Sequence, residues 1–456
     1  MTTVTLAPST DKDAPLLAGL PMIGNLLPFS RNILGFAQQC VNTYDALVEV
    51  KIMGGSCYIV THPALVEEVL VTKNQYFVKD EGFKAFTRPV FGDGMVTSDG
   101  DFWLRQRRLA QPAFHRQRIA AYGDVMTGFA ARTVELWRDG EVRDISADMM
   151  KLTLEVVAKT LFDQEENTEV AEIGSALNAI IARFDSSSLL ILLEMILQRP
   201  LPTPTDRRYQ QAVQRLDEIV SGVIRQRRAH DEAKQDLLAM FLATRDEDSK
   251  GMSDQQLLDE CKTMFLAGHE TSAQTLSWTL WLLDRHPAVK EKLRQELAQV
   301  LAGRVPTMND LPHLRYTEAV IMEALRLYPP IWRIQRQAAS DVMLGQYLIP
   351  QGSSVLMSNH AIQRSHRWYT DPERFDPERW QNNLIGRLPT FAYFPFGGGP
   401  RLCIGQQFGQ MEVAFILATI LQRVDLTMVP GQRVVPQPSL TIRPRNGLKM
   451  KVKRLT

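Results

Sequence analysis

The sequence predicts a mainly α-helical protein with small β-sheets. From about Phe102 onward, apolar residues recur at helical spacing, and one helix stands out because it continues from Ser253 to Pro287. Ser253 and Gln256 form a capping-box pattern at its start. At 1.5 Å per residue, this helix should be roughly 45–50 Å long. A helix of that length is expected to cross the whole molecule.

Shorter elements are predicted on both sides of this helix. A strand-like hairpin, LVEVKIMGGSCYIVT, occupies 47–61, with Gly54-Gly55 suited to its turn. Further strand-like pieces, VMLGQYLIP and SSVLMS, lie between the last two of the helices expected over 287–303, 311–327 and 404–423. No linker forces a division, so we expect one domain over 1–456, richer in strands at about 20–100 and helical from about 101 to 456.

Composition excludes several classes of protein. The 456 residues are 45% hydrophobic and carry a net charge of +1, which gives no reason to expect a nucleic-acid partner. Four widely spaced cysteines without a CxxC pair argue against zinc ribbons, iron–sulfur clusters and a disulfide framework. The longest apolar run, Leu189–Leu197, is far shorter than the ~20 residues that span a bilayer, and we assign most of it to the core. We expect a cytoplasmic monomer with reduced thiols and no transmembrane anchor.

One cysteine lies in an unusual loop, FGGGPRLCIG, at 396–405. A lone cysteine is more often a small buried hydrophobe, which is how we interpret Cys40, Cys57 and Cys261. Cys403, by contrast, follows three glycines that permit close backbone approach, and it precedes a helix whose N-terminus favours a thiolate. Such a thiolate suits a metal or a nucleophile. No histidine base lies near in sequence, although folding could supply one, and haem is the obvious cofactor for a single thiolate.

This loop resembles the haem-ligand loop of the cytochrome P450 family, F-x-x-G-x-R-x-C-x-G, and matches each fixed position. The resemblance implies that Cys403 is the axial ligand of the iron in haem b (iron protoporphyrin IX). It implies that Phe396 packs beside the sulfur and that Arg401 binds a haem propionate. Gly399 and Gly405 are the other two matches, and Gly405 would let the helix approach a flat macrocycle.

The long helix contains MFLAGHETSAQ, which resembles the A-G-x-[DE]-T signature of the same family at Ala267, Gly268, Glu270 and Thr271. Read alone, the segment would suggest a helix–helix contact with a satisfied threonine. The resemblance implies an oxygen-binding groove in which Glu270 and Thr271 are catalytic and manage protons. Many family members carry a second threonine, and Ser272 keeps a hydroxyl at that position.

Two other motifs agree with the resemblance. Glu323 and Arg326 can pair on one helix face, and the resemblance implies a buried structural network that Arg379 of FDPERW completes. Trp103 and Arg107 share one face of a predicted helix, where an indole N–H and a guanidinium could clamp an anion. The family pattern W-x-x-x-R assigns both to a haem propionate, with Arg336 as a further propionate ligand.

One position departs from the family. Relatives often have histidine where this chain has Gln363, in the segment IQRSHRW. We expect the change to affect a propionate or a surface contact and to leave the chemistry unaffected.

The activity implied by the resemblance is reductive activation of O2 as co-substrate. One oxygen atom would hydroxylate or epoxidise a lipophilic small molecule, such as a fatty acid, a terpenoid or a steroid-like compound. Two electrons would come from a ferredoxin or flavodoxin-type donor with its reductase, docking on the Cys403 side. The alternatives are a peroxide-driven haem-thiolate peroxygenase, which usually lacks the Glu270–Thr271 pair, and a non-catalytic haem-thiolate sensor or ligand-binding protein.

The resemblance also suggests a substrate pocket. Its candidate residues come from four separate parts of the chain and are apolar as a set, which fits a lipophilic ligand. Taken singly, each would more often be ordinary core. The candidates are Phe83, Phe86, Val90, Val96, Met264, Ile331, Trp332, Ile334 and Leu440.

Overall fold

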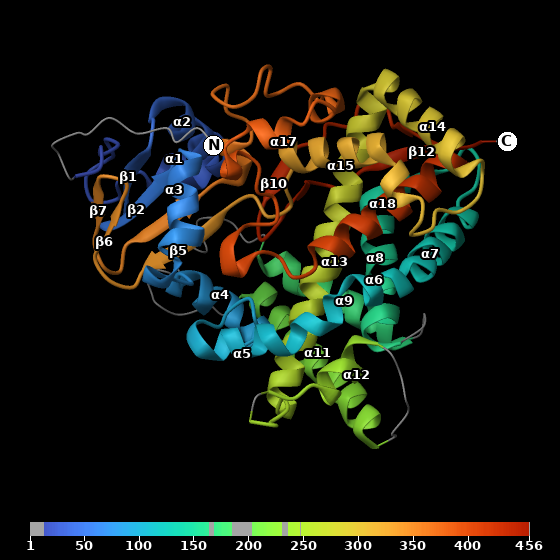
Figure 1. Ribbon diagram of the computed structural model, residues 1–456, viewed down its shortest axis with the longest axis horizontal. Coiled ribbons are helices and arrows are strands. Elements are labelled where there is room, and N and C mark those ends of the chain that lie inside the picture. The colour runs from blue at the N-terminus through green and yellow to red at the C-terminus, as the bar shows by residue number, and fades with distance from the viewer. Residues whose placement is uncertain (1–12, 164–167, 185–202, 230–235, 247, 456) are drawn as a thin grey trace. The chain divides into compact units, whose positions relative to one another are not determined.

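The computed structural model describes residues 13–163, 168–184, 203–229, 236–246 and 248–455, and is mainly helical with small sheets, as predicted (Figure 1). The predicted run Leu189–Leu197 lies outside these residues. The chain forms two compact units, and unit 1 contains Met1–Phe86, Ile331–Arg374 and Arg379–Cys403. Unit 2 contains Thr87–Pro330, Phe375–Glu378 and Ile404–Thr456. Besides the strand-rich N-terminal part, unit 1 thus includes two later stretches of chain, and nothing in the sequence indicated that they belong with it. The single domain over 1–456 stays a prediction.

Unit 1 is built on a five-stranded sheet with strand order β1-β2-β8-β5-β3. Only β2 and β8 pair in parallel. Its strands are β1 (Leu47–Ile52), β2 (Gly55–Val60), β3 (Phe77–Val78), β5 (Ile334–Ala338) and β8 (Ser354–Met357), with β6 (Val342–Leu344) and β7 (Tyr347–Ile349) in a separate hairpin. Its helices are α1 (Leu26–Arg31), α2 (Ile33–Thr43), α3 (Pro63–Glu67), α16 (Asn359–Ile362) and α17 (Leu384–Arg387), while α4 (Glu81–Phe91) continues into unit 2.

The predicted hairpin is confirmed, with one change in its turn. Ile52 pairs with Gly55, so the two turn residues are Met53 and Gly54, both with positive φ, and Gly55 already belongs to β2. Side chains alternate between the two faces of the sheet, as the strand period requires. Leu47, Tyr58 and Val355 enter one apolar cluster, whereas Val48, Cys57 and Leu356 enter the other.

The end of unit 1 is the loop that carries Cys403. Gly399 has a φ of +65°, which favours glycine, and a Cβ atom there would lie only 1.9 Å from the carbonyl oxygen of Leu70. Leu70 belongs to a single π-helical turn, Glu68–Thr72, that follows α3. The loop therefore lies directly against another backbone, and only a residue without a side chain fits at position 399.

Unit 2 is dominated by helices. They are α5 (Gly100–Ala110), α6 (Arg116–Ala121), α7 (Gly123–Glu135), α8 (Ile145–Phe162), α9 (Thr168–Phe184), α11 (Pro204–Ala229), α12 (Leu237–Ala243), α13 (Asp254–Arg285), α14 (Pro287–Leu301), α15 (Arg315–Leu327) and α18 (Gln406–Arg423). Its strands β4 (Val142–Asp144), β12 (Lys449–Arg454) and β9 (Val424–Met428) form one sheet in that order, and β10 (Pro436–Pro438) pairs with β11 (Ile442–Pro444).

The long helix α13 matches its prediction at both ends. The Ser253 hydroxyl accepts a hydrogen bond from the Gln256 N–H, and the Gln256 side chain accepts one from the Ser253 N–H, so the capping box is complete. The helix ends at Arg285, and Pro287 starts α14. It packs along α8 and also contacts α11, α15 and α18 (Figure 1). Among the described residues, no helix combines the length and apolar character that a membrane span requires.

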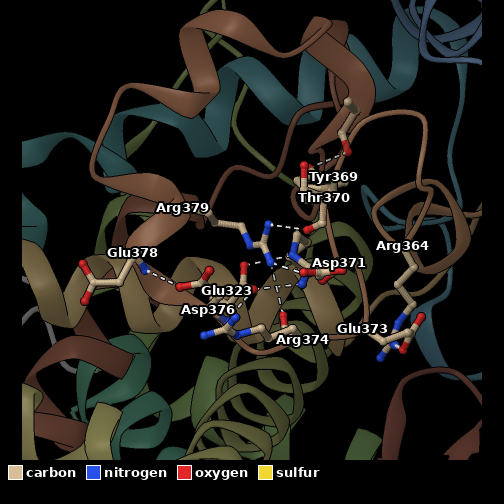
Figure 2. Close-up of polar contacts among 12 residues, drawn as sticks. Glu323, Arg364, Tyr369, Thr370, Asp371, Glu373, Arg374, Asp376, Glu378 and Arg379 are labelled. Atoms are coloured by element: carbon tan, nitrogen blue, oxygen red, sulfur yellow. Dashed lines mark hydrogen bonds and ion pairs between the residues drawn. The ribbon is translucent and has the colours of Figure 1, made fainter.

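A buried ion pair connects α15 to the segment that follows residue 374. Arg326 donates to Glu323 through Nε at 2.9 Å and through Nη2 at 2.8 Å, and both side chains have no solvent exposure. Glu323 also accepts the Asp376 N–H at 2.9 Å (Figure 2). In unit 1, Arg379 donates to the backbone carbonyls of Thr370, Asp371 and Arg374 (Figure 2). The pair is as predicted, and the participation of Arg379 in its network stays a prediction.

Replacing Glu323 with glutamine should destabilise the protein strongly. The variant leaves the Arg326 guanidinium buried without its counter-charge, and breaking such a pair costs about 3–5 kcal/mol. Lys292→Gln is the matched control, because the Lys292–Glu378 pair is about half exposed and should be worth less than about 1 kcal/mol. Urea unfolding monitored by circular dichroism measures both. Equal losses in the two variants would contradict the prediction.

Gly399→Ala should cost more stability than Gly54→Ala. Both glycines have positive φ, and alanine pays roughly 1–2 kcal/mol for that conformation. No atom lies within 4 Å of the Cβ position at Gly54, whereas the carbonyl of Leu70 occupies the space at Gly399. Urea unfolding of both variants gives the difference. If the two curves coincide, the close approach at Leu70 is not a constraint on the folded chain.

Candidate active site

Cys403 is the exposed member of the four cysteines. The other three are buried, and burial raises the pKa values of Cys40 and Cys57 to about 12. The position of Cys403 is fixed by its own N–H, which donates to the carbonyl of Phe396 at 3.0 Å. A strongly turned loop with an accessible sulfur is what a thiolate ligand needs. The buried interpretation of Cys40, Cys57 and Cys261 is confirmed.

Other predicted residues of unit 1 lie in this loop or on the strand beside it. Phe396 and Arg401 are half-buried, and Arg401 ends the 3₁₀ turn Gly399–Arg401. Arg336 lies on β5, is 9% exposed and donates to the carbonyl of Gln335. A Cβ atom at Gly397 would lie 3.5 Å from the Ile334 side chain, so β5 passes next to the loop. Unit 1 therefore brings Cys403, Phe396, Arg401 and Arg336 into one neighbourhood.

Gln363, the departure from the family, is fully buried and has a definite structural contact. Its Oε1 accepts the N–H of Phe394 at 2.9 Å, two residues before Phe396. The expectation that this position makes a surface contact is therefore wrong. The amide holds the backbone of the segment that leads into the Cys403 loop.

In unit 2, the predicted oxygen-groove motif lies in the middle of α13. The Thr271 hydroxyl donates to the carbonyl of Ala267 at 2.8 Å, one turn earlier, as the sequence suggests. A Cβ atom at Gly268 would lie 3.0 Å from Val157 of α8, so this glycine permits close packing of the two helices. Thr153 of α8 also donates to the carbonyl of His269 at 2.9 Å. The motif therefore contacts α8 and also carries the hydroxyl group of Thr271 and the carboxyl group of Glu270.

Glu270 is a buried acid with one strong hydrogen bond. Its side chain is 2% exposed, and Oε1 accepts the hydroxyl hydrogen of Thr441 at 2.7 Å. Burial raises the pKa of Glu270 to about 7, while the Thr441 hydrogen bond opposes that rise. Near neutral pH the carboxyl group therefore exists in both protonation states, which is suitable for proton transfer.

The predicted propionate clamp of unit 2 lies on α5, where a helix was expected. Trp103 is buried and Arg107 is half-buried, and the two are four positions apart on one helix face. Gly405 directly precedes α18, which begins two residues later than predicted. The sequence therefore placed Trp103 and Arg107 on the correct element, and their role as propionate ligands stays a prediction, as does the close approach of a macrocycle at Gly405.

Sequence reasoning missed a second buried acid, Glu412 on α18. The side chain is fully buried, burial raises its pKa to about 8, and the nearby Ser272 hydroxyl of α13 lowers that pKa only in part. Neither carboxylate oxygen has a hydrogen bond within normal geometry among the described residues. A single charge inside the apolar run MEVAFILATIL was the available signal. The contact of Thr441 with Glu270 had no such signal.

The candidate substrate residues are divided between the two units. Phe83, Phe86, Ile331, Trp332 and Ile334 belong to unit 1, whereas Val90, Val96, Met264 and Leu440 belong to unit 2. Val90, Met264 and Trp332 are buried, Ile331 is exposed and the others are half-buried. A separate groove of about 730 Å³ in unit 2 lies between α8, α9, α13 and the β10–β11 hairpin. None of the candidate residues lines it.

Comparison with known proteins identifies the family. The family described as Cytochrome P450 matches residues 15–452 of the chain. Cyclooctat-9-en-7-ol 5-monooxygenase of Streptomyces melanosporofaciens is 36% identical, over 93% of this chain and 91% of its own. Cyclooctatin synthase of the same organism is 35% identical, over 93% and 92%. Pentalenene oxygenase of Streptomyces avermitilis is 34% identical, over 93% of each.

A solved structure agrees with the sequence relatives. The crystal structure of the cytochrome P450DA heme domain superposes with a TM-score of 0.87 at 29% identity, covering 97% of this chain and 98% of the other. The fold, the thiolate loop and the matching relatives all point to one conclusion. The chain belongs to the cytochrome P450 family and is a monooxygenase with haem b as its cofactor and O2 as its co-substrate.

Proposed function

We propose that this monooxygenase hydroxylates or epoxidises a neutral, polycyclic terpenoid, using two electrons from a separate protein. The observation that carries the reaction type is the Glu270 carboxyl, which is buried next to Thr271 in α13 and accepts the Thr441 hydroxyl hydrogen at 2.7 Å. The choice of substrate class is supported by relatives named for cyclooctatin, cyclooctat-9-en-7-ol and pentalenene. The apolar set of candidate pocket residues fits such a ligand.

The residues of unit 1 suit the holding of haem through sulfur. Cys403 presents an accessible thiol from a loop that Gly399 and the Phe396 carbonyl fix in place. When bound, haem supplies the iron that binds and activates O2. Cys403 would ligate the iron and Phe396 would cover the sulfur. The guanidinium groups of the remaining candidates, with the Trp103 indole N–H, would bind the propionates; these are Arg107, Arg336 and Arg401.

Glu270 and Thr271 would supply protons for the reaction. A carboxyl group that is partly protonated near pH 7 can receive a proton and pass it on without a large energetic cost in either direction. The Thr271 hydroxyl already donates to Ala267, so its oxygen remains an acceptor for a hydrogen bond from water or from a reacting group. Ala267 and Gly268 belong to the same turn and would border the site of O2.

The electron source is a separate protein in this proposal. We expect a ferredoxin or flavodoxin-type donor with its reductase, docking on the Cys403 side, in the cytoplasm. A peroxide-driven enzyme is the competing possibility, because it would need no electron donor. The buried acid beside Thr271 favours the reductive route, since peroxide-using relatives usually lack that pair.

Cys403→Ala should abolish the red-shifted Soret band of the reduced, CO-bound protein, because that band requires a thiolate ligand. Cys40→Ala, which removes a buried sulfur from the same unit, should retain it. Absorption spectra of the two variants under CO with dithionite make the comparison. A thiolate-type band that survives in Cys403→Ala would contradict the assignment.

Polycyclic terpenes should bind better than fatty acids. The candidate pocket residues carry no cation to pair with a carboxylate, so we expect a spin-state shift at lower concentration with pentalenene than with palmitate.

Formation of product should require NADPH, a ferredoxin and its reductase. In Thr271→Ala, a larger share of the electrons should be lost as peroxide than in the unmodified protein. Efficient turnover with H2O2 alone, unchanged in Thr271→Ala, would favour the peroxygenase instead.

A further inference from the structure

A single hydrogen bond connects the acid of α13 to a distant part of the chain. Thr441 Oγ1 donates to Glu270 Oε1 at 2.7 Å across a separation of 171 residues. Both side chains are 2% exposed, so water contributes little to the surroundings of either group. A hydrogen bond to a charged acceptor in such a place is stronger than the same bond in solvent.

The backbone on either side of Thr441 is tied to unit 2. The carbonyl of Thr441 accepts the Ser439 N–H at 3.0 Å, and the Ile442 N–H donates to the carbonyl of Pro330 at 2.9 Å. The carbonyl of Ile442 accepts Nε1–H of Trp278, two turns after Glu270 on α13, at 3.0 Å. Three hydrogen bonds that do not involve Glu270 thus hold the backbone around Thr441 in place, and the one from Trp278 fixes it against α13.

Among the described residues, the pKa of Glu270 is set by burial and by the Thr441 hydrogen bond. The ionisable residues near the middle of α13, on this helix and on the elements packed against it, include His269 and Lys262 of α13, Lys151 and Glu155 of α8, Glu323 and Arg326 of α15, Arg443 of β11 and Glu412 of α18. The shift in the pKa of Glu270 arises from burial and from the Thr441 hydrogen bond, with no resolved contribution from these charges. The threonine is therefore the one resolved influence that favours the ionised form.

Glu270 lies on α13 near two residues that line the groove of unit 2, and those two residues are only 2% exposed. His269 and Gln274, which precede and follow it, line the groove of unit 2 together with Arg443. The groove opens to water, because Ser175 and Asn178 on its wall are exposed. Glu270 is not among the residues that line this groove, and its carboxyl stays buried beside it.

We propose that Thr441 is a positioning residue that holds the Glu270 carboxyl in one orientation and stabilises its ionised form. This proposal rests on the proposed function, in which Glu270 transfers protons. Thr441 itself need not touch haem or substrate. Loss of the Thr441 hydroxyl should affect the ionisation of Glu270 more than it affects the affinity for substrate.

Removing the hydroxyl should make Glu270 harder to ionise. Thr441→Val keeps the shape of the side chain and deletes the donor, so we expect the apparent pKa of Glu270 to rise by about one pH unit. Thr441→Ser keeps the donor and should keep the pKa. Thr160→Val is the matched control, because Thr160 of α8 is equally buried and donates only to carbonyls of its own helix.

Two measurements separate the ionisation of Glu270 from coupling, which is the fraction of the consumed electrons that is recovered in product. Infrared difference spectra between each protein and its Glu270→Gln counterpart report the protonated carboxyl band of Glu270 as a function of pH. The fraction of electrons recovered in product, at saturating substrate, gives the functional consequence. We expect an upward shift and at least a twofold loss of coupling in Thr441→Val, rescue in Thr441→Ser, and neither change in Thr160→Val. Thr441→Ala replaces the valine variant if the latter does not fold.

The outcomes distinguish this proposal from the one on which it rests. An unchanged carboxyl band and unchanged coupling in Thr441→Val, combined with poor coupling in Glu270→Gln, would overturn the role of Thr441 alone. Full coupling in Glu270→Gln would instead overturn the proton-transfer role of Glu270. A shift that Thr441→Ser fails to rescue would show that packing, and not the hydroxyl, was responsible.

Discussion

The fold of unit 2 depends on compensating interactions for the ionisable side chains that are buried along α13. Lys262 is 3% exposed and forms an ion pair with Asp217 at 2.7 Å, while Asp259 accepts the backbone N–H of Asp93 at 3.0 Å. Glu260 accepts the N–H of Met95, and burial still raises its pKa to about 8. Each group buried on this helix requires either a partner or a change of protonation state. Glu260 and Glu270 have both, and Glu270 combines them with a position next to the Thr271 hydroxyl.

The sequence predicted those features of the fold that local patterns determine. The capping box at Ser253, the stop at Pro287 and the hairpin at 47–61 are encoded by neighbouring residues, and all three occur in the structure. The parallel pairing of β2 with β8 was not predictable, because it joins residues almost 300 positions apart. Local periodicity carries no information about which distant strand supplies the partner.

The residues of the candidate site show the same difference between local motifs and distant contacts. Cys403, Glu270 and Thr271 were found because their motifs are short and continuous, and the structure places them on the expected loop and helix. Gln363 and Thr441 were not understood, because their importance lies in contacts with Phe394 and Glu270 that only the folded chain creates. A polar residue looks alike in sequence whether it faces water or completes a distant hydrogen bond.

The discontinuity of unit 1 has a consequence for how this protein is made. The sheet strands β1 and β2 emerge early from the ribosome, yet their partner β8 and the loop that packs on Leu70 are synthesised more than 250 residues later. Until then, the edge of β2 and the apolar cluster beneath it remain incomplete, and such surfaces are prone to aggregation. At about 5–20 residues per second this interval is on the order of tens of seconds. During that time the nascent chain would benefit from a chaperone more than the finished enzyme would.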